Sequence, residues 1–204
     1  MTTTTKGEHT KARIIQAAAD LVLERGVAGT SLDDVRAASA TSKSQLYHYF
    51  DDKAALLREV VGAQAERVLE AQRPLLEDLD SWAGLARWCD AAVAGMAQND
   101  CRGGCPLGSL VTELADTDPA AREAIAVAFK RWERHLVTGL SAMRDRGELL
   151  PDAQPAELAV ATMASLQGGL LLAQAARSTE PLQLALHAAL RHLRSWAAPE
   201  RRTD

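Results

Sequence analysis

The side chains best suited to chemistry lie between residues 42 and 53, where hydroxyl, amide, lysine and aromatic groups follow one another. Lysine can pair with guanine or a phosphate, glutamine can pair with adenine, and a tyrosine ring can touch a thymine methyl group. Lys53 and the start of its helix can hold a phosphate backbone. The residues expected to face nucleic acid are Ser42, Lys43, Ser44, Gln45, Tyr47, His48, Tyr49 and Lys53.

Three short helices are predicted to position these side chains. The first covers about residues 10–25, where apolar residues recur at helical spacing, and it ends at Gly26 because glycine is a common helix stop. The second begins at Ser31, and Asp34 three residues later resembles a capping box. These two helices form the support on which a third one packs.

The third helix is expected to begin after Ser42 and to end near Phe50. Leu46 and Phe50 are four residues apart, so they share a face that packs against the first two helices. The opposite face then presents the polar first turn to solvent. A short helix, a tight turn and a polar second helix are typical of a helix-turn-helix that enters a DNA groove. An ordinary helical hairpin with solvated polar residues is the alternative.

The rest of the chain is also predicted to be helical, because helix-favouring residues dominate and no alternating strand pattern occurs. The further helices are expected at about 53–73, 81–98, 106–115, 119–146, 155–177 and 181–197. Proline fits a helix start, and four prolines lie at such positions: Pro106, Pro119, Pro155 and Pro181. Gly147 should end the longest helix. The predicted fold class is all-α, with about nine helices.

The net charge is distributed unevenly along the chain, and this distribution limits the class of partners that it can bind. The formal net charge is −4, yet residues 1–53 hold seven basic and seven acidic residues, so the remainder supplies all of the excess. A neutral segment can still bind phosphates if its cations share one face. The acidic remainder disfavours a protein that coats nucleic acid generally. No apolar run approaches the length of a membrane helix, and no signal peptide is visible, so a cytoplasmic protein is expected.

Residues 30–56 carry the pattern T-S-L-D-D-V-x10-L-Y-H-Y-F-x-x-K-x-x-L. It resembles the N-terminal signature of the TetR (tetracycline-repressor) family of bacterial transcription regulators, and the resemblance covers about residues 10–57 closely. Residues 104–114 are similar to a stretch in one subgroup of that family. The family's turn usually holds glycine and then a hydrophobic residue, whereas this chain has Ala40 and Thr41. A non-glycine residue in the left-handed conformation there would cost about 1 kcal/mol.

The resemblance implies the organisation of the whole chain. Residues 1–53 would form the helix-turn-helix DNA-binding domain, and residues 54–204 would form a helical domain for ligand binding and dimerisation. Two subunits would bind a near-palindromic operator, and a small molecule would release them by moving the helix that begins at Lys53. The implied function is a ligand-responsive transcription regulator, most often a repressor, which is neither an enzyme nor a membrane protein and needs no cofactor.

A partner-helix seam is expected in the last two helices. Glycine inside a helix costs about 1 kcal/mol, so the pair at Gly168 and Gly169 suggests close approach of another helix. The final helix carries an apolar stripe, and little protein remains to cover it. The residues expected in the dimer interface are Gly168, Gly169, Leu172, Leu186, Leu190 and Leu193. The alternative is that these residues belong to the core of one subunit.

An effector pocket is expected among tryptophan, methionine and leucine side chains, because these line adaptable apolar cavities. The ligand-binding candidates are Trp82, Trp88, Met96, Leu110, Leu114, Trp132, Met163 and Gln167. The acidic body favours an apolar or aromatic effector that is neutral or cationic. The alternative is that most of these residues are ordinary core.

The chain has three cysteines, and two of them, Cys101 and Cys105, flank Arg102 and two glycines. An arginine beside a thiol can lower its pKa, so a redox- or metal-responsive regulator on the same scaffold is an alternative function. No histidine cluster lies nearby to complete a metal site, and no metal is predicted. Structural thiols are favoured at these positions. An enzyme or a helical interaction module without DNA is the remaining alternative.

Overall fold

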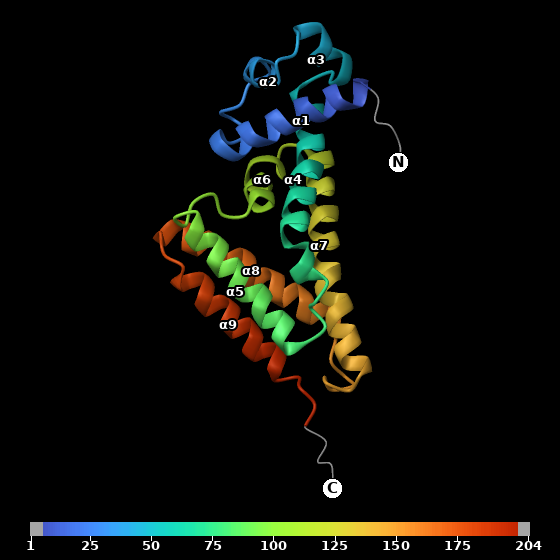
Figure 1. The fold of residues 1–204 in the computed structure, drawn as a ribbon, viewed down its shortest axis with the longest axis vertical. Helices are drawn as coiled ribbons and strands as arrows, with labels where there is room; N and C mark the ends of the chain where they lie inside the picture. Colours follow the sequence, from blue (N-terminus) through green and yellow to red (C-terminus); the bar gives the residue numbers. More distant parts are fainter. Residues whose placement is uncertain (1–5, 200–204) are drawn as a thin grey trace. The chain divides into compact units, whose positions relative to one another are not determined.

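The structure is a computed structural model that describes residues 6–199, and in that range it contains nine helices and no strand (Figure 1). The predicted all-α fold class is confirmed. The helices are α1 Lys6–Arg25, α2 Leu32–Ala38, α3 Lys43–Tyr49, α4 Lys53–Leu76, α5 Trp82–Gln98, α6 Pro106–Leu114, α7 Pro119–Asp145, α8 Pro155–Ala176 and α9 Glu180–Arg194. The three prolines at the starts of α6, α7 and α8 occupy the first helical position, as predicted.

The chain divides into two compact units. Unit 1 comprises Met1–Val68 and Pro106–Phe129, and unit 2 comprises Leu69–Cys105 and Lys130–Asp204. Helices α4 and α7 each begin in unit 1 and end in unit 2. Helix α6 therefore belongs with α1–α3, from which it is well separated in sequence. The predicted functional boundary after residue 53 lies inside unit 1 and stays a prediction.

Two apolar clusters hold unit 1 together. The first joins α1, α2, α3 and the start of α4, with Ile14, Leu46 and Val60 almost fully buried. The second joins α1 and α4 to α6 and to the first part of α7. Helix α6 contributes Leu110 and Leu114 to this second cluster. The hydrophobic contacts of α3 and α6 are thus both made within unit 1.

Helices α8 and α9 pack along each other in unit 2, and α5 also contacts α9. The close approach of α8 and α9 depends on Gly169. A Cβ atom at this position would lie 2.8 Å from Leu182 Cδ1 and 3.0 Å from Leu182 Cα, whereas a Cβ atom at Gly168 would meet nothing within 4 Å. The two adjacent glycines therefore have different surroundings within one subunit.

Helix α8 is apolar on several sides. By length and composition it could cross a membrane, so the expectation that no apolar run approaches the length of a membrane helix was wrong. Eight of its residues are nevertheless buried within the protein, among them Leu158, Met163 and Leu166. The helix is therefore partly buried within unit 2, while other apolar residues along it are exposed.

Two predicted helix ends were wrong. Helix α4 was expected to end near Pro74, yet it continues to Leu76, because a proline in the last turn removes only its own backbone donor and Glu77 N still donates to Arg73 O at 3.1 Å. Helix α9 was expected to reach residue 197 but ends at Arg194. The chain after it pairs instead with the loop before α8, where Leu150 N donates to Trp196 O at 2.8 Å.

Candidate nucleic-acid interface

Side-chain caps fix the starts of α2 and α3, as predicted. In α2, Ser31 Oγ accepts from Asp34 N at 3.1 Å and the Asp34 carboxylate accepts from Ser31 N at 2.9 Å. The hydrogen bonds from the side chain and then the backbone of Ser31 lower the pKa of Asp34. In α3, Ser42 Oγ accepts from Gln45 N at 3.1 Å, and Gln45 Oε1 accepts from Ser42 N at 2.9 Å. These reciprocal bonds set the register at which each helix begins.

The turn between α2 and α3 is left-handed at Ala40, with a φ of 48°. The predicted cost of a non-glycine residue at this turn therefore applies. A buried hydrogen bond of 2.8 Å between Ser39 Oγ and Thr41 Oγ1 spans the turn, and Thr41 N donates to Arg36 O at 3.1 Å. Polar contacts thus hold a turn for which glycine would be the unstrained choice.

Helix α3 presents its polar face to solvent. Leu46 and Phe50 are buried, as predicted, while Tyr47 is 47% exposed. The other exposed candidates are Ser42, Lys43, Ser44, Gln45 and His48. Tyr49 is half-buried, and its ring meets the His48 ring edge-on with centroids 4.9 Å apart. The exposed side chains of α3 and its cap therefore include hydroxyl, amide, ammonium and aromatic groups, the set needed to contact bases and phosphates.

Two of these exposed residues already make side-chain contacts within α3 and its cap. Gln45 uses its carbonyl oxygen to accept from the Ser42 backbone, so its amide nitrogen is the donor left for a base. Lys43 leans over the Tyr47 ring, with Nζ 5.9 Å from the ring centroid. The cap and this contact pre-organise the first turn of α3.

Lys53 has a different environment from the other candidates. Its Nζ donates to Val27 O at 2.6 Å in the turn after α1, and the contact is partly buried. The sequence suggested only a phosphate contact for this lysine. Nothing in the local sequence around Lys53 signals the contact with Val27, because the two residues are brought together by the packing of α1 against α4.

The ligand-binding candidates fall into both units. Leu110 and Leu114 lie in the second apolar cluster of unit 1. The other six lie in unit 2, and four of them are buried: Trp88, Met96, Trp132 and Met163. Trp82 is half-buried with the Arg194 guanidinium 4.9 Å from its ring centroid. Gln167 Nε2 is buried and, among the described residues, has no hydrogen-bond partner.

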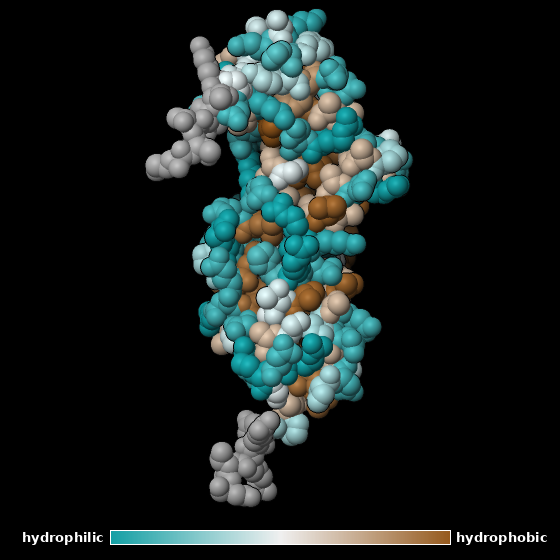
Figure 2. Space-filling view, turned by 90° about the vertical axis from the view of Figure 1, so that its right-hand side faces the viewer, coloured by the Kyte–Doolittle hydropathy of each residue, from teal (hydrophilic) through white to brown (hydrophobic). Residues whose placement is uncertain are grey.

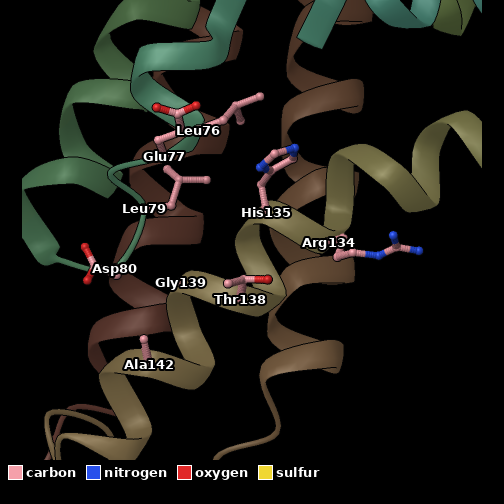
Figure 3. A pocket seen from close by; sticks show the side chains of 9 residues that line it. All are labelled: Leu76, Glu77, Leu79, Asp80, Arg134, His135, Thr138, Gly139 and Ala142. Atoms are coloured by element: carbon pink, nitrogen blue, oxygen red, sulfur yellow. The ribbon is translucent and has the colours of Figure 1, made fainter.

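A cavity of about 390 Å³ lies in unit 2, between the end of α4, the following loop and α7 (Figure 3). Its lining residues are Leu76, Glu77, Leu79, Asp80, Arg134, His135, Thr138, Gly139 and Ala142. In Figure 3 the Arg134 guanidinium points away from Glu77 and Asp80. None of the eight sequence-predicted ligand residues lines this cavity, so it is a separate hollow with mixed polar and apolar walls.

The dimer-interface candidates separate into exposed and buried sets. Gly168 is exposed and Leu172 is 57% exposed, whereas Gly169, Leu186 and Leu193 are buried within the subunit. Leu190 is half-buried. Three exposed apolar residues of α8 and α9 were not singled out from the sequence: Val160, Leu171 and Leu184. Hydrophobic residues also reach the surface on the face that Figure 2 shows.

The three cysteines are buried, and none of them forms a disulfide within residues 6–199. Cys101 and Cys105 are 5% and 8% exposed, and Arg177 Nη1 donates to Cys101 O at 3.1 Å. Burial, and then the nearby Asp90 carboxylate, raises the pKa of Cys89 to about 12. Across residues 6–199 no group of three or more histidine, cysteine or acidic residues is placed to hold a metal.

Comparisons with known proteins agree with this geometry. Residues 14–60 match the family described as "Bacterial regulatory proteins, tetR family", and residues 82–189 match "Tetracyclin repressor-like, C-terminal domain". An uncharacterized HTH-type transcriptional regulator of Mycobacterium tuberculosis is 32% identical over 198 residues, covering 93% of this chain and 96% of the relative.

Two further similarities extend over most of the chain. A second uncharacterized HTH-type regulator, from Lactococcus lactis, is 32% identical over 180 residues, which cover 86% of this chain and 88% of that protein. The solved structure of a TetR-family transcriptional regulator from Cytophaga hutchinsonii superposes with a TM-score of 0.83 at 22% identity. It covers 98% of this chain and all of the solved one. The structural likeness supports the fold, and the sequence matches support the family.

Proposed function

Since the chain belongs to the TetR family of bacterial transcription regulators, we propose that it is a dimeric repressor which a small apolar molecule releases from a near-palindromic operator. The single observation that carries the proposal is the exposed polar face of α3, held in place by the buried Leu46 and Phe50. The proposed partner is double-stranded operator DNA, and the proposed location is the cytoplasm. We assign the chain no catalytic role.

In this proposal the first turn of α3 contacts base edges in the major groove. Lys43 supplies a cation for guanine or phosphate, the Gln45 amide nitrogen donates to a base, and the Tyr47 ring contacts a thymine methyl group or the backbone. His48 and Ser44 flank these residues on the exposed surface. The acidic start of α2 repels phosphate, so base contacts come from α3 alone.

The apolar outer surface of α8 and α9 supports a dimer. Leu171, Leu172 and Leu184 are each more than half exposed in the single subunit. Exposed leucines on two helices that pack on each other favour a protein-protein interface. A twofold axis through this surface would give two α3 helices, which a near-palindromic operator matches. The proposed interface retains Gly168 and Leu172 from the sequence prediction.

The proposed effector is an apolar or aromatic molecule that also carries a hydrogen-bond acceptor. Buried tryptophan and methionine side chains of unit 2 favour an apolar ligand. The buried Gln167 Nε2 supports an acceptor on the ligand, because a buried donor is normally hydrogen-bonded. Effector binding needs to favour the released state by only about 1–3 kcal/mol to alter operator occupancy several-fold.

The decisive experiment measures operator binding by α3 variants. Duplexes that the wild-type protein selects from a random-sequence pool serve as the operator probe. Lys43→Ala or Tyr47→Ala should weaken binding by about 1–3 kcal/mol while the dimer and its thermal stability are retained. Lys130→Ala removes an exposed cation from α7 and serves as the control, which should bind like wild type. Normal binding by both α3 variants would show that α3 is not the recognition helix.

A further inference from the structure

We infer that Lys53 and Glu113 are positioning residues for the recognition helix, and that Lys53 serves in this role in place of the phosphate contact expected from the sequence. The inference rests on the proposed contact of α3 with DNA. Glu113 lies in α6, outside the helix-turn-helix, yet both residues belong to unit 1. Both residues would affect operator affinity without contacting a base.

The two side chains bond to the two backbone polar groups of Val27. Glu113 Oε2 accepts from Val27 N at 2.6 Å and is 3.4 Å from Ala28 N. Lys53 Nζ donates to Val27 O at 2.6 Å. A charged acceptor and a charged donor thus engage the backbone polar groups of one residue, and charge-assisted hydrogen bonds are about twice as strong as neutral ones. We call this arrangement the Val27 clamp.

The clamp is built into the packing of unit 1. The Val27 side chain packs against the apolar cluster that contains Leu110 and Leu114 of α6. The residue before it, Gly26, has a φ of +76°, and a Cβ atom there would lie 3.0 Å from Glu113 Oε2. The carboxylate therefore occupies the space left by the missing side chain. Both the polar and the apolar contacts fasten α6 to the end of α1.

The clamped turn leads directly into the DNA-binding helices. Val27 O also accepts from Thr30 N at 3.3 Å, and Thr30 Oγ1 donates to Gly26 O at 2.9 Å. The next residue, Ser31, is the cap of α2. Helix α2 packs with α3 in the first cluster of unit 1, so a shift of the turn would displace the support of α3. The clamp therefore sets the orientation in which α3 meets the groove.

The direction in which Glu113→Ala changes DNA affinity distinguishes a positioning role from simple electrostatic repulsion. Removing a carboxylate from a DNA-binding unit reduces repulsion of phosphate, so electrostatics alone predicts tighter binding. Positioning predicts weaker binding to the selected duplex, with little change on a random duplex. Glu24→Ala removes a carboxylate from the last turn of α1, which is outside the clamp, and serves as the matched control.

The experiment measures binding of full-length variants to a duplex selected by wild type and to a duplex of random sequence. Glu113→Ala should lower affinity for the selected duplex at least tenfold and leave random-duplex affinity within twofold. Glu113→Gln keeps an acceptor oxygen and should restore affinity to within threefold of wild type. Glu24→Ala should bind as tightly as wild type or tighter. Equal or tighter selected-duplex binding by Glu113→Ala would overturn the inference.

Salt dependence tests Lys53 separately. Each neutralised phosphate contributes about 0.9 to the slope of log affinity against log salt. Lys53→Met should weaken selected-duplex binding at least fivefold with an unchanged slope. A slope flattened by about 1.8 for the dimer would identify Lys53 as a phosphate contact in both subunits and overturn the inference. If Glu113→Ala fails to fold, Lys53→Met and Glu113→Gln still decide the question.

Amide exchange provides a readout without DNA. Hydrogen exchange at the Val27 amide, followed by NMR, should be at least tenfold faster in Glu113→Ala and unchanged in Glu24→Ala. Unchanged exchange in Glu113→Ala would mean that no clamp exists. A wild-type protein that selects no duplex, while Val27 exchange behaves as expected, would refute the proposed DNA-binding function and the positioning role that rests on it, and would leave the clamp itself as a structural contact.

Discussion

Helices α3 and α8 differ in the polarity of the side chains that they expose to solvent. Helix α3 is short, buries Leu46 and exposes polar or aromatic groups around it. Helix α8 is long, buries residues such as Leu166 and also exposes leucines such as Leu171 and Leu172. Polarity therefore marks the inner and outer faces of α3, but it does not distinguish those of α8.

This contrast indicates what each surface contacts. A polar outer face is stable in water and can exchange its hydration for bases and phosphates. An apolar outer face costs free energy in water and is stabilised when another apolar surface covers it. Burying one leucine side chain contributes about 1.5–3 kcal/mol, so a few such residues on each subunit can hold a dimer.

The largest expected effect comes from charging the outer face of α8. The double variant Leu171→Asp and Leu172→Asp should dissociate the dimer at micromolar concentration, because it would bury unpaired carboxylates at the seam. Analytical ultracentrifugation should show monomers, and operator affinity should fall more than a hundredfold. Val127→Asp charges a valine of α7 that is 53% exposed and should leave the dimer intact. A fully dimeric double variant would place the interface elsewhere.

A smaller effect is expected at the adjacent glycines of α8. Gly169→Ala should destabilise the protein by about 1–3 kcal/mol relative to Gly168→Ala, because the new methyl group meets the Leu182 backbone in α9. Both variants gain the same helix propensity, so the difference isolates the cost of close packing. Urea unfolding measures it. Equal stabilities would mean that α9 can move aside at no cost.

Gly168→Ala also tests the proposed seam. Within the subunit its Cβ atom has open space, so helix propensity alone would add about 1 kcal/mol of stability. The proposed seam includes Gly168 and predicts the opposite for the assembly: a lower dimer stability, because a partner helix approaches position 168 closely. A dimer as stable as wild type would place the partner helix away from position 168. Sedimentation of the variant across a concentration series separates the two outcomes.

The sequence was most informative where structure is set locally. The caps at Ser31 and Ser42, and the buried pair Leu46 and Phe50, follow from spacings of three and four residues, which fix neighbours along a helix. The left-handed φ of Ala40 likewise follows from the tight turn that contains it. Most of the DNA-facing candidates are exposed in or next to α3 for the same reason.

Features that depend on distant partners were less accessible from the sequence. Lys53 contacts Val27, and Leu110 and Leu114 join a cluster with α1, because the tertiary fold brings these segments together. Leu186 and Leu193 are buried within unit 2, although an apolar stripe on a terminal helix suggested a partner. Helical periodicity shows that a face is apolar, but it does not show which neighbour covers that face.

A modest gain in stability is expected at the turn before α3. Ala40→Gly should stabilise the protein by about 1 kcal/mol at most, because glycine adopts a φ of 48° without Cβ strain, while its greater freedom when unfolded offsets part of the gain. Thermal unfolding measures the change. Operator affinity should be unchanged, since the buried bond between Ser39 and Thr41 still holds the turn. A destabilised variant would mean that the turn is not strained by alanine.

The smallest effect concerns the cap of α2 and its dependence on pH. Hydrogen bonds from Ser31 hold the pKa of Asp34 below its ordinary value of 3.8, so the carboxylate stabilises the fold above that pH. This stabilisation is lost as the pH falls through the lower, folded-state pKa. Asp34→Asn should therefore have a lower free energy of unfolding than wild type at pH 7, and this gap should close in acid.

The matched control is Asp33→Asn, which removes the neighbouring charge without touching the cap. The difference in unfolding free energy between this variant and wild type should change less over the same pH range. Urea unfolding of both variants between pH 7 and pH 2.5 makes the comparison, and a gap for Asp34→Asn that persists undiminished at pH 2.5 would show that charge on the cap does not stabilise α2.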